Sequence, residues 1–145
     1  MPRIDFYVLH PPASQDLAQF ACRLLDKIWQ QGYRVYIHTN NQAQAQALSQ
    51  LLWTFRDTSF VPHDLYPDAV SSKAPVRIGY HPTQACSGME ILINLATHVP
   101  EFYQRFERVV EIVNQDPAVR AAGRQRYRVY REAGDLPEAP HDIHQ

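Results

Sequence analysis

A short segment near the C-terminus concentrates the side chains best suited to binding an anion. Between positions 116 and 134 the sequence has five arginines, no lysine and two acidic residues, whereas the whole 145-residue chain has a formal net charge of −1. A guanidinium group donates two parallel hydrogen bonds to a carboxylate or a phosphate. The segment therefore predicts a local site for an anionic partner, because the rest of the chain has no positive excess with which to coat a polyanion.

Helical spacing places most of these arginines on one side of a helix. At about 100° per residue, four of them fall within an arc of about 80°. They are Arg120, Arg124, Arg128 and Arg131, here called the arginine stripe. Tyr127 adds an aromatic surface beside the stripe, and Arg126 lies at its opposite margin. A solvated helix face is the alternative, but few acids are placed to pair with the arginines along the helix. The pattern suits an acidic peptide, a terminal carboxylate or a phosphate.

A second candidate surface lies between Leu51 and Leu65, where large apolar residues surround a proline. The residues concerned are Trp53, Phe60, Val61 and Pro62. Two interpretations stay open. Large apolar residues usually belong to the core, whereas an exposed apolar patch would bind a protein partner.

Motifs for nucleotides, metals and nucleophiles are missing from the sequence. The turn after the first predicted strand, HPPASQ, has no glycine to let a phosphate approach a helix N-terminus. Cys22 and Cys86 lie far apart without CxxC spacing, so neither a disulfide scaffold nor a zinc site is predicted. We therefore expect no catalytic residues, no metal and no cofactor. His10 and His38 follow or end two predicted strands, and a small enzyme using them as acid and base is kept as a third possible function.

Alternating strands and helices predict an α/β fold. Strands are predicted over residues 3–9, 33–39, 60–61, 76–80 and 90–95, and helices over residues 14–32, 40–52, 102–113 and 117–133. Short links between them predict a mostly parallel sheet flanked by helices, with a C-terminal helical pair.

Composition predicts one domain and a short tail. Residues 1–134 form the predicted domain, and residues 135–145, with three acids and two prolines, form a predicted flexible tail. No apolar run approaches the roughly 20 residues of a membrane helix, and the N-terminus lacks a signal-peptide pattern. A soluble, cytoplasmic protein is expected.

Several segments together resemble the chi subunit of the bacterial DNA polymerase III holoenzyme. They are DFYVL (5–9), LLW followed by SFVPHDL (51–65), APVRIGY (74–80), EILINL (90–95) and RQRYRVYREAG (124–134). The resemblance runs from Phe6 to Gly134. It implies a Rossmann-like sheet in a non-enzymatic accessory protein of the clamp loader, located in the bacterial cytoplasm with the nucleoid-associated replisome.

The resemblance also implies two protein partners. One is the psi subunit, assigned to Trp53, Phe60, Val61 and Pro62. The other is the acidic C-terminal tail of single-stranded DNA-binding protein, assigned to Val113, Arg120, Arg124, Tyr127 and Arg128. DNA would be reached only indirectly. The residues alone leave an alternative open, in which the same stripe binds single-stranded nucleic acid directly and Tyr127 stacks on a base.

Overall fold

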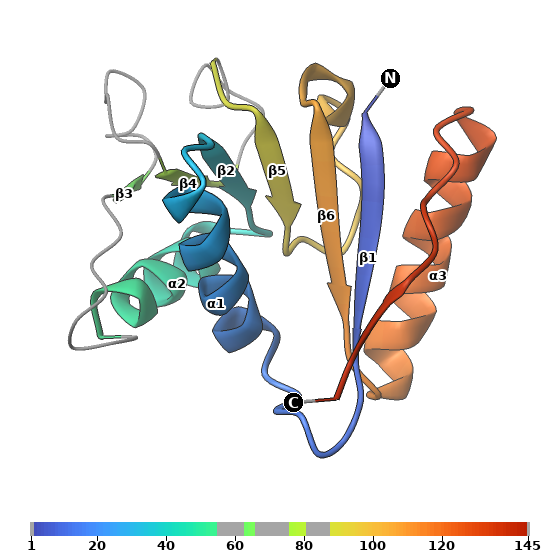
Figure 1. The fold of residues 1–145 in the computed structure, drawn as a ribbon, viewed down its shortest axis with the longest axis horizontal. Helices are drawn as coiled ribbons and strands as arrows, with labels where there is room; N and C mark the ends of the chain where they lie inside the picture. The colour runs from blue at the N-terminus through green and yellow to red at the C-terminus, as the bar shows by residue number, and fades with distance from the viewer. Residues whose placement is uncertain (1, 55–62, 66–75, 81–87, 145) are drawn as a thin grey trace.

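A parallel β-sheet organises the chain. The computed structural model describes residues 2–54, 63–65, 76–80 and 88–144, and these form a seven-stranded sheet in the order β3-β4-β2-β5-β6-β1-β7 (Figure 1). The strands are β1 (Arg3–Leu9), β2 (Val35–His38), β3 (His63–Leu65), β4 (Val76–Gly79), β5 (Ile91–Asn94), β6 (Arg108–Val113) and β7 (His141–Ile143). Every neighbouring pair runs parallel, as the alternation of strands and helices predicted.

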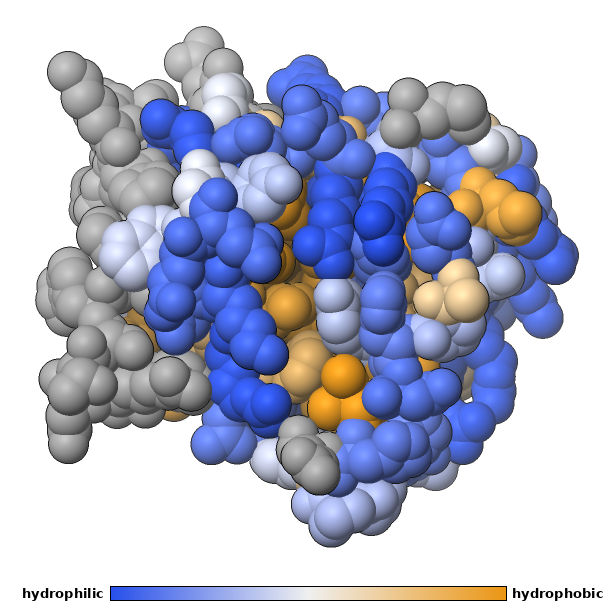
Figure 2. Space-filling model, viewed as in Figure 1, coloured by the Kyte–Doolittle hydropathy of each residue, from blue (hydrophilic) through white to orange (hydrophobic). Residues whose placement is uncertain are grey.

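Helices cover both faces of this sheet. They are α1 (Leu17–Gln30), α2 (Gln42–Thr54) and α3 (Pro117–Glu132), with α1 and α2 on one face and α3 on the other (Figure 1). One apolar cluster, including Leu25 and Ile37, fills the α1/α2 side, and a second, including Phe6 and Tyr130, fills the α3 side. In Figure 2 hydrophilic side chains cover most of the visible face and hydrophobic ones show through near its centre.

Polar side chains cap the N-terminal ends of the three helices. The helix predicted over residues 14–32 begins at Leu17, because the carboxylate of Asp16 accepts a hydrogen bond from the Gln19 amide and so caps α1. The Asn41 side chain accepts from the amide of Gln44 at the start of α2. Asp116 accepts from two amides at the start of α3. These caps explain why helices start where they do.

The predicted helix over residues 102–113 is wrong. The structure has a short 3₁₀ turn at Tyr103–Arg105 followed by strand β6, so α3 alone remains of the predicted C-terminal helical pair. The apolar residues fit a helical period, but the segment RVVEIV is rich in β-branched residues. A strand buried on both faces has a nearly continuous apolar run, and such a run also fits helical spacing.

The predicted flexible tail differs from the structure as well. Asp135 is buried and accepts a 2.6 Å hydrogen bond from the Tyr103 hydroxyl. Residues 141–143 form β7, which extends the sheet beyond β1. The composition of this segment resembles that of a frayed end, but pairing with a distant strand edge gives it regular structure. No helix among the described residues is long and apolar enough to cross a membrane.

Candidate functional site

The α3 helix packs closely on the sheet because of a glycine. Gly123 faces the end of β6, and a Cβ atom at this position would lie only 2.6 Å from Cγ1 of Val113. Any larger residue would therefore push the helix away from the strand. Tyr130, also on the inner face of α3, is fully buried. This close packing sets the position of the arginine stripe relative to β1 and β6.

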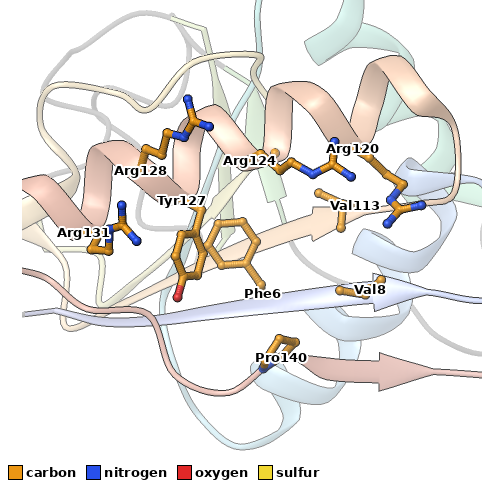
Figure 3. A pocket seen from close by; sticks show the side chains of 10 residues that line it. Phe6, Val8, Val113, Arg120, Arg124, Tyr127, Arg128, Arg131 and Pro140 are labelled. Carbon is orange, nitrogen blue, oxygen red and sulfur yellow. The ribbon is translucent and has the colours of Figure 1, made fainter.

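A groove of about 450 Å³ runs between α3 and β1. Its lining consists of Phe6 and Val8 from β1, Val113 from β6, Arg120, Gly123, Arg124, Tyr127, Arg128 and Arg131 from α3, and Pro140 (Figure 3). We call it the arginine groove. A volume of this size accommodates a few side chains of a ligand.

The floor of the arginine groove is apolar. Val8 and Val113 are neighbours in the parallel register of β1 and β6. The Phe6 ring lies 5.6 Å from the Tyr127 ring at an interplanar angle of 54°, an arrangement typical of aromatic contacts in protein cores. Tyr127 is only half-buried, so one part of its ring is available to a ligand. The floor can therefore receive an apolar or aromatic side chain.

The rim is cationic and its charges are available. All four members of the arginine stripe are exposed, and none forms a side-chain hydrogen bond or ion pair with the described residues. In Figure 3 Arg120 and Arg124 lie at the Val113 end of the groove, whereas Arg131 lies at the other end. Four guanidinium groups beside an apolar floor can bind a ligand that has both carboxylates and an apolar residue.

Arg126 has a different role from its neighbours. It is buried, and its Nε donates a 2.8 Å hydrogen bond to Glu111, the charged residue in the middle of β6. The other carboxylate oxygen of Glu111 accepts from the Tyr130 hydroxyl at 2.5 Å and from the Asn94 amide at 2.8 Å. Burial raises the pKa of Glu111, and the Arg126 guanidinium opposes that shift. The buried ion pair between Arg126 and Glu111 therefore stabilises the packing of α3 on the sheet.

The structure brings together all five residues predicted for the acidic tail. Val113, Arg120, Arg124, Tyr127 and Arg128 line the one groove. Sequence reasoning missed Phe6, Val8, Gly123 and Pro140. Alternation along β1 places Phe6 and Val8 on one sheet face, but no sequence signal says which helix covers that face. Pro140 lies in the segment predicted to be flexible.

The predicted psi-binding residues are not placed. Phe60, Val61 and Pro62, together with the predicted short strand at 60–61, lie outside the described residues, and so does Cys86. Trp53 belongs to the last turn of α2, but its side chain is not described. Their assignment to a partner stays a prediction.

The two candidate catalytic histidines do not form one site. Strands β5 and β6 separate β1 from β2, and the register places His38 level with Phe6, four residues before His10. The two histidines are therefore more than three strand spacings, or more than roughly 14 Å, apart. His10 lies 2.7 Å from the Asp142 carboxylate, whereas His38 packs edge-on against Phe102. Within the described ranges, no cluster of three or more His, Cys, Asp or Glu side chains could hold a metal ion.

Amide side chains occupy the crevice where α/β folds usually bind nucleotides. The neighbouring strands β1 and β6 are followed by helices on opposite faces of the sheet, α1 after β1 and α3 after β6. The crevice lies between the carboxyl ends of these two strands. Here Asn114 donates to the Gln15 carbonyl at 2.8 Å, and the Gln115 side chain donates to the Leu9 carbonyl at 2.9 Å. One N–H donor of each side-chain amide at this edge of the sheet is thus bonded to a backbone carbonyl of the chain itself.

Fold and site together define a class: an α/β domain whose candidate site is a groove for an anionic, partly apolar ligand. The family model of the DNA polymerase III chi subunit, HolC, matches residues 1–136. The chain is 40% identical over 134 residues to DNA polymerase III subunit chi of Pseudomonas aeruginosa, covering 92% of each protein. It is 33% identical over 138 residues to that subunit of Escherichia coli, covering 92% of this chain and 94% of the relative. The chain belongs to the DNA polymerase III chi subunit family and is thus a replication accessory protein.

Proposed function

We propose that this chain links the DNA polymerase III clamp loader to single-stranded DNA-binding protein, without catalysing a reaction itself. It would bind the psi subunit with one surface and the acidic C-terminal tail of single-stranded DNA-binding protein with another. The observation that carries the proposal is the arginine groove, in which exposed arginines that have no ion pair with the described residues border an apolar floor. Such a tail ends in Pro-Phe with a free carboxylate, so its chemistry is complementary to both parts of the groove.

Each of the five groove residues predicted for the acidic tail has a role in this proposal. Arg124 would bind the terminal carboxylate, since its guanidinium lies at the Val113 end of the groove (Figure 3). Tyr127 and Val113 would receive the phenylalanine ring. Arg120 and Arg128 would attract the acidic residues that precede the ring, mainly by charge, because both side chains are exposed to solvent.

The second contact, with psi, is proposed at Trp53, Phe60, Val61 and Pro62. Trp53 belongs to the last turn of α2, and this helix lies on the sheet face opposite α3. A partner at this position would leave the arginine groove open. The proposed location is the bacterial cytoplasm, within the replisome at the nucleoid.

A peptide titration tests the proposed tail site. A labelled acidic peptide ending in Pro-Phe should bind in the micromolar range and more weakly as salt rises. Arg124→Ala should lower the affinity by at least tenfold, while Lys27→Ala, which removes an exposed positive charge from α1 on the opposite face, should leave it unchanged. Equal affinities of the wild-type protein and Arg124→Ala would contradict the proposal.

Direct binding of single-stranded nucleic acid is the second candidate function. Tyr127 among the arginines favours it, because an aromatic ring beside cations can stack on a base. The proposed tail site predicts weak or no binding of a single-stranded oligonucleotide at the salt concentration where the peptide binds. An oligonucleotide that binds more tightly than the peptide, and loses affinity in Arg124→Ala, would favour the second function.

A further inference from the structure

The C-terminal residues 135–143, here called the strap, are held against β1. At one end, the Asp135 amide donates to the Tyr130 carbonyl at 3.0 Å and the Asp135 carboxylate is buried. In the middle, the Glu138 amide donates to the Ile4 carbonyl at 2.9 Å. At the other end, residues 141–143 pair with β1 as strand β7. The strap is thus attached to α3 at one end and to β1, the strand that carries Phe6 and Val8, at two further points.

Charged side chains reinforce the outer end of the strap. His141 lies 3.1 Å from the buried Asp5 carboxylate on β1, and its ring stacks on that of Tyr7 at 4.5 Å. The Asp142 carboxylate lies 2.7 Å from Nε2 of His10. Both contacts tie β7 to β1 or to the residue after it. The outer end of the strap is therefore held by side chains of the chain itself.

Pro140 gives the arginine groove its wall opposite α3. It lies between the Glu138–Ile4 hydrogen bond and the start of β7, and its ring lines the groove across β1 from the arginine stripe (Figure 3). Phe6 and Val8 form the floor between these two walls. A side chain entering the groove would thus meet Tyr127 on one side and Pro140 on the other.

The two walls of the groove differ in charge. The α3 wall has four exposed arginines, whereas residues 135–145 contain three acids and no lysine or arginine. Of the acids on the strap, Glu138 is exposed, Asp135 is buried and Asp142 lies beside His10. Carboxylates of a ligand are therefore attracted to the α3 wall and disfavoured along the strap. An apolar residue of the same ligand would then lie on the strap side of the groove.

We infer that the strap, through Pro140, sets the specificity of the arginine groove for an acidic peptide that ends in a large apolar residue. This inference rests on the proposed function, since it concerns the same groove. Without the strap, the groove would attract acidic segments of any kind. With it, the apolar end residue is enclosed between Tyr127, Phe6 and Pro140. The family match ends at residue 136, before Pro140.

The test measures preference, because a merely structural role of Pro140 would weaken all peptides alike. Two acidic peptides, one ending in Phe and the other in Ala, are titrated into the wild-type chain and into Pro140→Ala. The substitution removes two ring carbons. At about 0.8 kcal/mol per buried methylene group, the preference for the Phe peptide should fall roughly fourfold if the ligand buries one of them and roughly fifteenfold if it buries both. Pro140→Val keeps an apolar wall and should retain the preference. Pro117→Ala, the same change at the exposed start of α3, should also retain it.

The outcomes separate this inference from the proposed function. If wild-type protein prefers the Phe peptide and Pro140→Ala keeps that full preference, the inference is wrong and the proposed function stands. If wild-type protein binds neither peptide, both fail. Loss of preference in Pro140→Val as well as Pro140→Ala would also contradict the inference, because an apolar side chain at position 140 would then not be what matters. Circular dichroism melting of each variant confirms that the fold is retained.

Discussion

Substitution of Arg126 on α3 should lower the free energy of unfolding strongly, whereas substitution of Arg124, only two positions away, should hardly change it. Arg124 is exposed in the arginine groove, whereas Arg126 is buried and donates to Glu111 from Nε at 2.8 Å and to the Thr97 carbonyl from Nη1 at 3.0 Å. Arg126→Met keeps most of the side-chain volume and removes the positive charge. It leaves the Glu111 carboxylate, which is fully buried, with only the neutral donors of Tyr130 and Asn94.

The expected cost follows from that unpaired carboxylate. Removing one partner of a buried ion pair costs about 3–5 kcal/mol of unfolding free energy, a large share of the roughly 5–15 kcal/mol that holds a domain folded. For a chain of this size the melting temperature should fall by roughly 10–15 °C. Arg124→Ala should change the unfolding free energy by less than about 0.5 kcal/mol, because that side chain is exposed and makes no ion pair with the described residues.

Urea denaturation at neutral pH, followed by circular dichroism, measures both effects. The double variant Arg126→Met/Glu111→Gln should recover at least half of the lost stability, since the buried negative charge is then gone. The deficit of Arg126→Met should also shrink as the pH falls. A carboxyl group whose pKa is raised in the folded state destabilises it only while ionised, and protonation removes that penalty. An Arg126→Met protein within about 1 kcal/mol of wild type at neutral pH would refute the reasoning.

Three further predictions concern the packing and titration of other residues. Gly123→Ala should destabilise by about 1–3 kcal/mol in urea denaturation, because its Cβ would approach Val113 to 2.6 Å; a gain in stability from the higher helix propensity of alanine would contradict this. Burial raises the pKa of Asp5, but hydrogen bonds from His141 and Arg108 outweigh it and leave that pKa below its usual value. The ionised Asp5 carboxylate therefore contributes to the free energy of unfolding above about pH 4. This contribution is lost as the pH falls through the lower folded-state pKa. Asp5→Asn should flatten this part of a plot of unfolding free energy against pH. Burial raises the pKa of the Cys22 thiol to about 12, so this thiol is protonated and unreactive at pH 8 in the folded protein. In a Cys86→Ser variant, a thiol reagent at pH 8 should therefore label the protein only after it unfolds. Rapid labelling of the native variant would contradict this prediction.

Local sequence signals were sufficient for most helices and strands. Capping residues such as Asp116, followed by proline, mark the start of α3, and helical spacing places the arginine stripe on one side of it. Short β-branched runs mark β1, β2, β4 and β5 within a few residues of their observed ends. These properties are encoded within a window of one or two turns, so they are readable without knowing what packs where.

The identity of β6 was not readable in this way. Its residues satisfy both a helical period and a buried strand, and only pairing with β1 and β5 decides between the two. The burial of Arg126 depends on that decision. Its partner Glu111 lies 15 positions earlier, on a segment that local spacing assigned to a helix. Helical spacing therefore separated Arg126 from the arginine stripe but did not show that Arg126 is buried in an ion pair.

The chain's sequence by itself determined α3, its cationic side and the resemblance to the chi family. The tertiary structure decided that this side borders a groove, because a groove needs surfaces from elements far apart in the chain. Phe6, Val113, Tyr127 and Pro140 meet there although more than 130 positions separate the first from the last. Their meeting depends on the order of strands in the sheet and on the pairing of β7 with the edge of β1. Which strands pair with one another depends on the whole sheet, because each strand bonds to segments far away in the chain. A local pattern of residue types therefore does not specify the order of the strands.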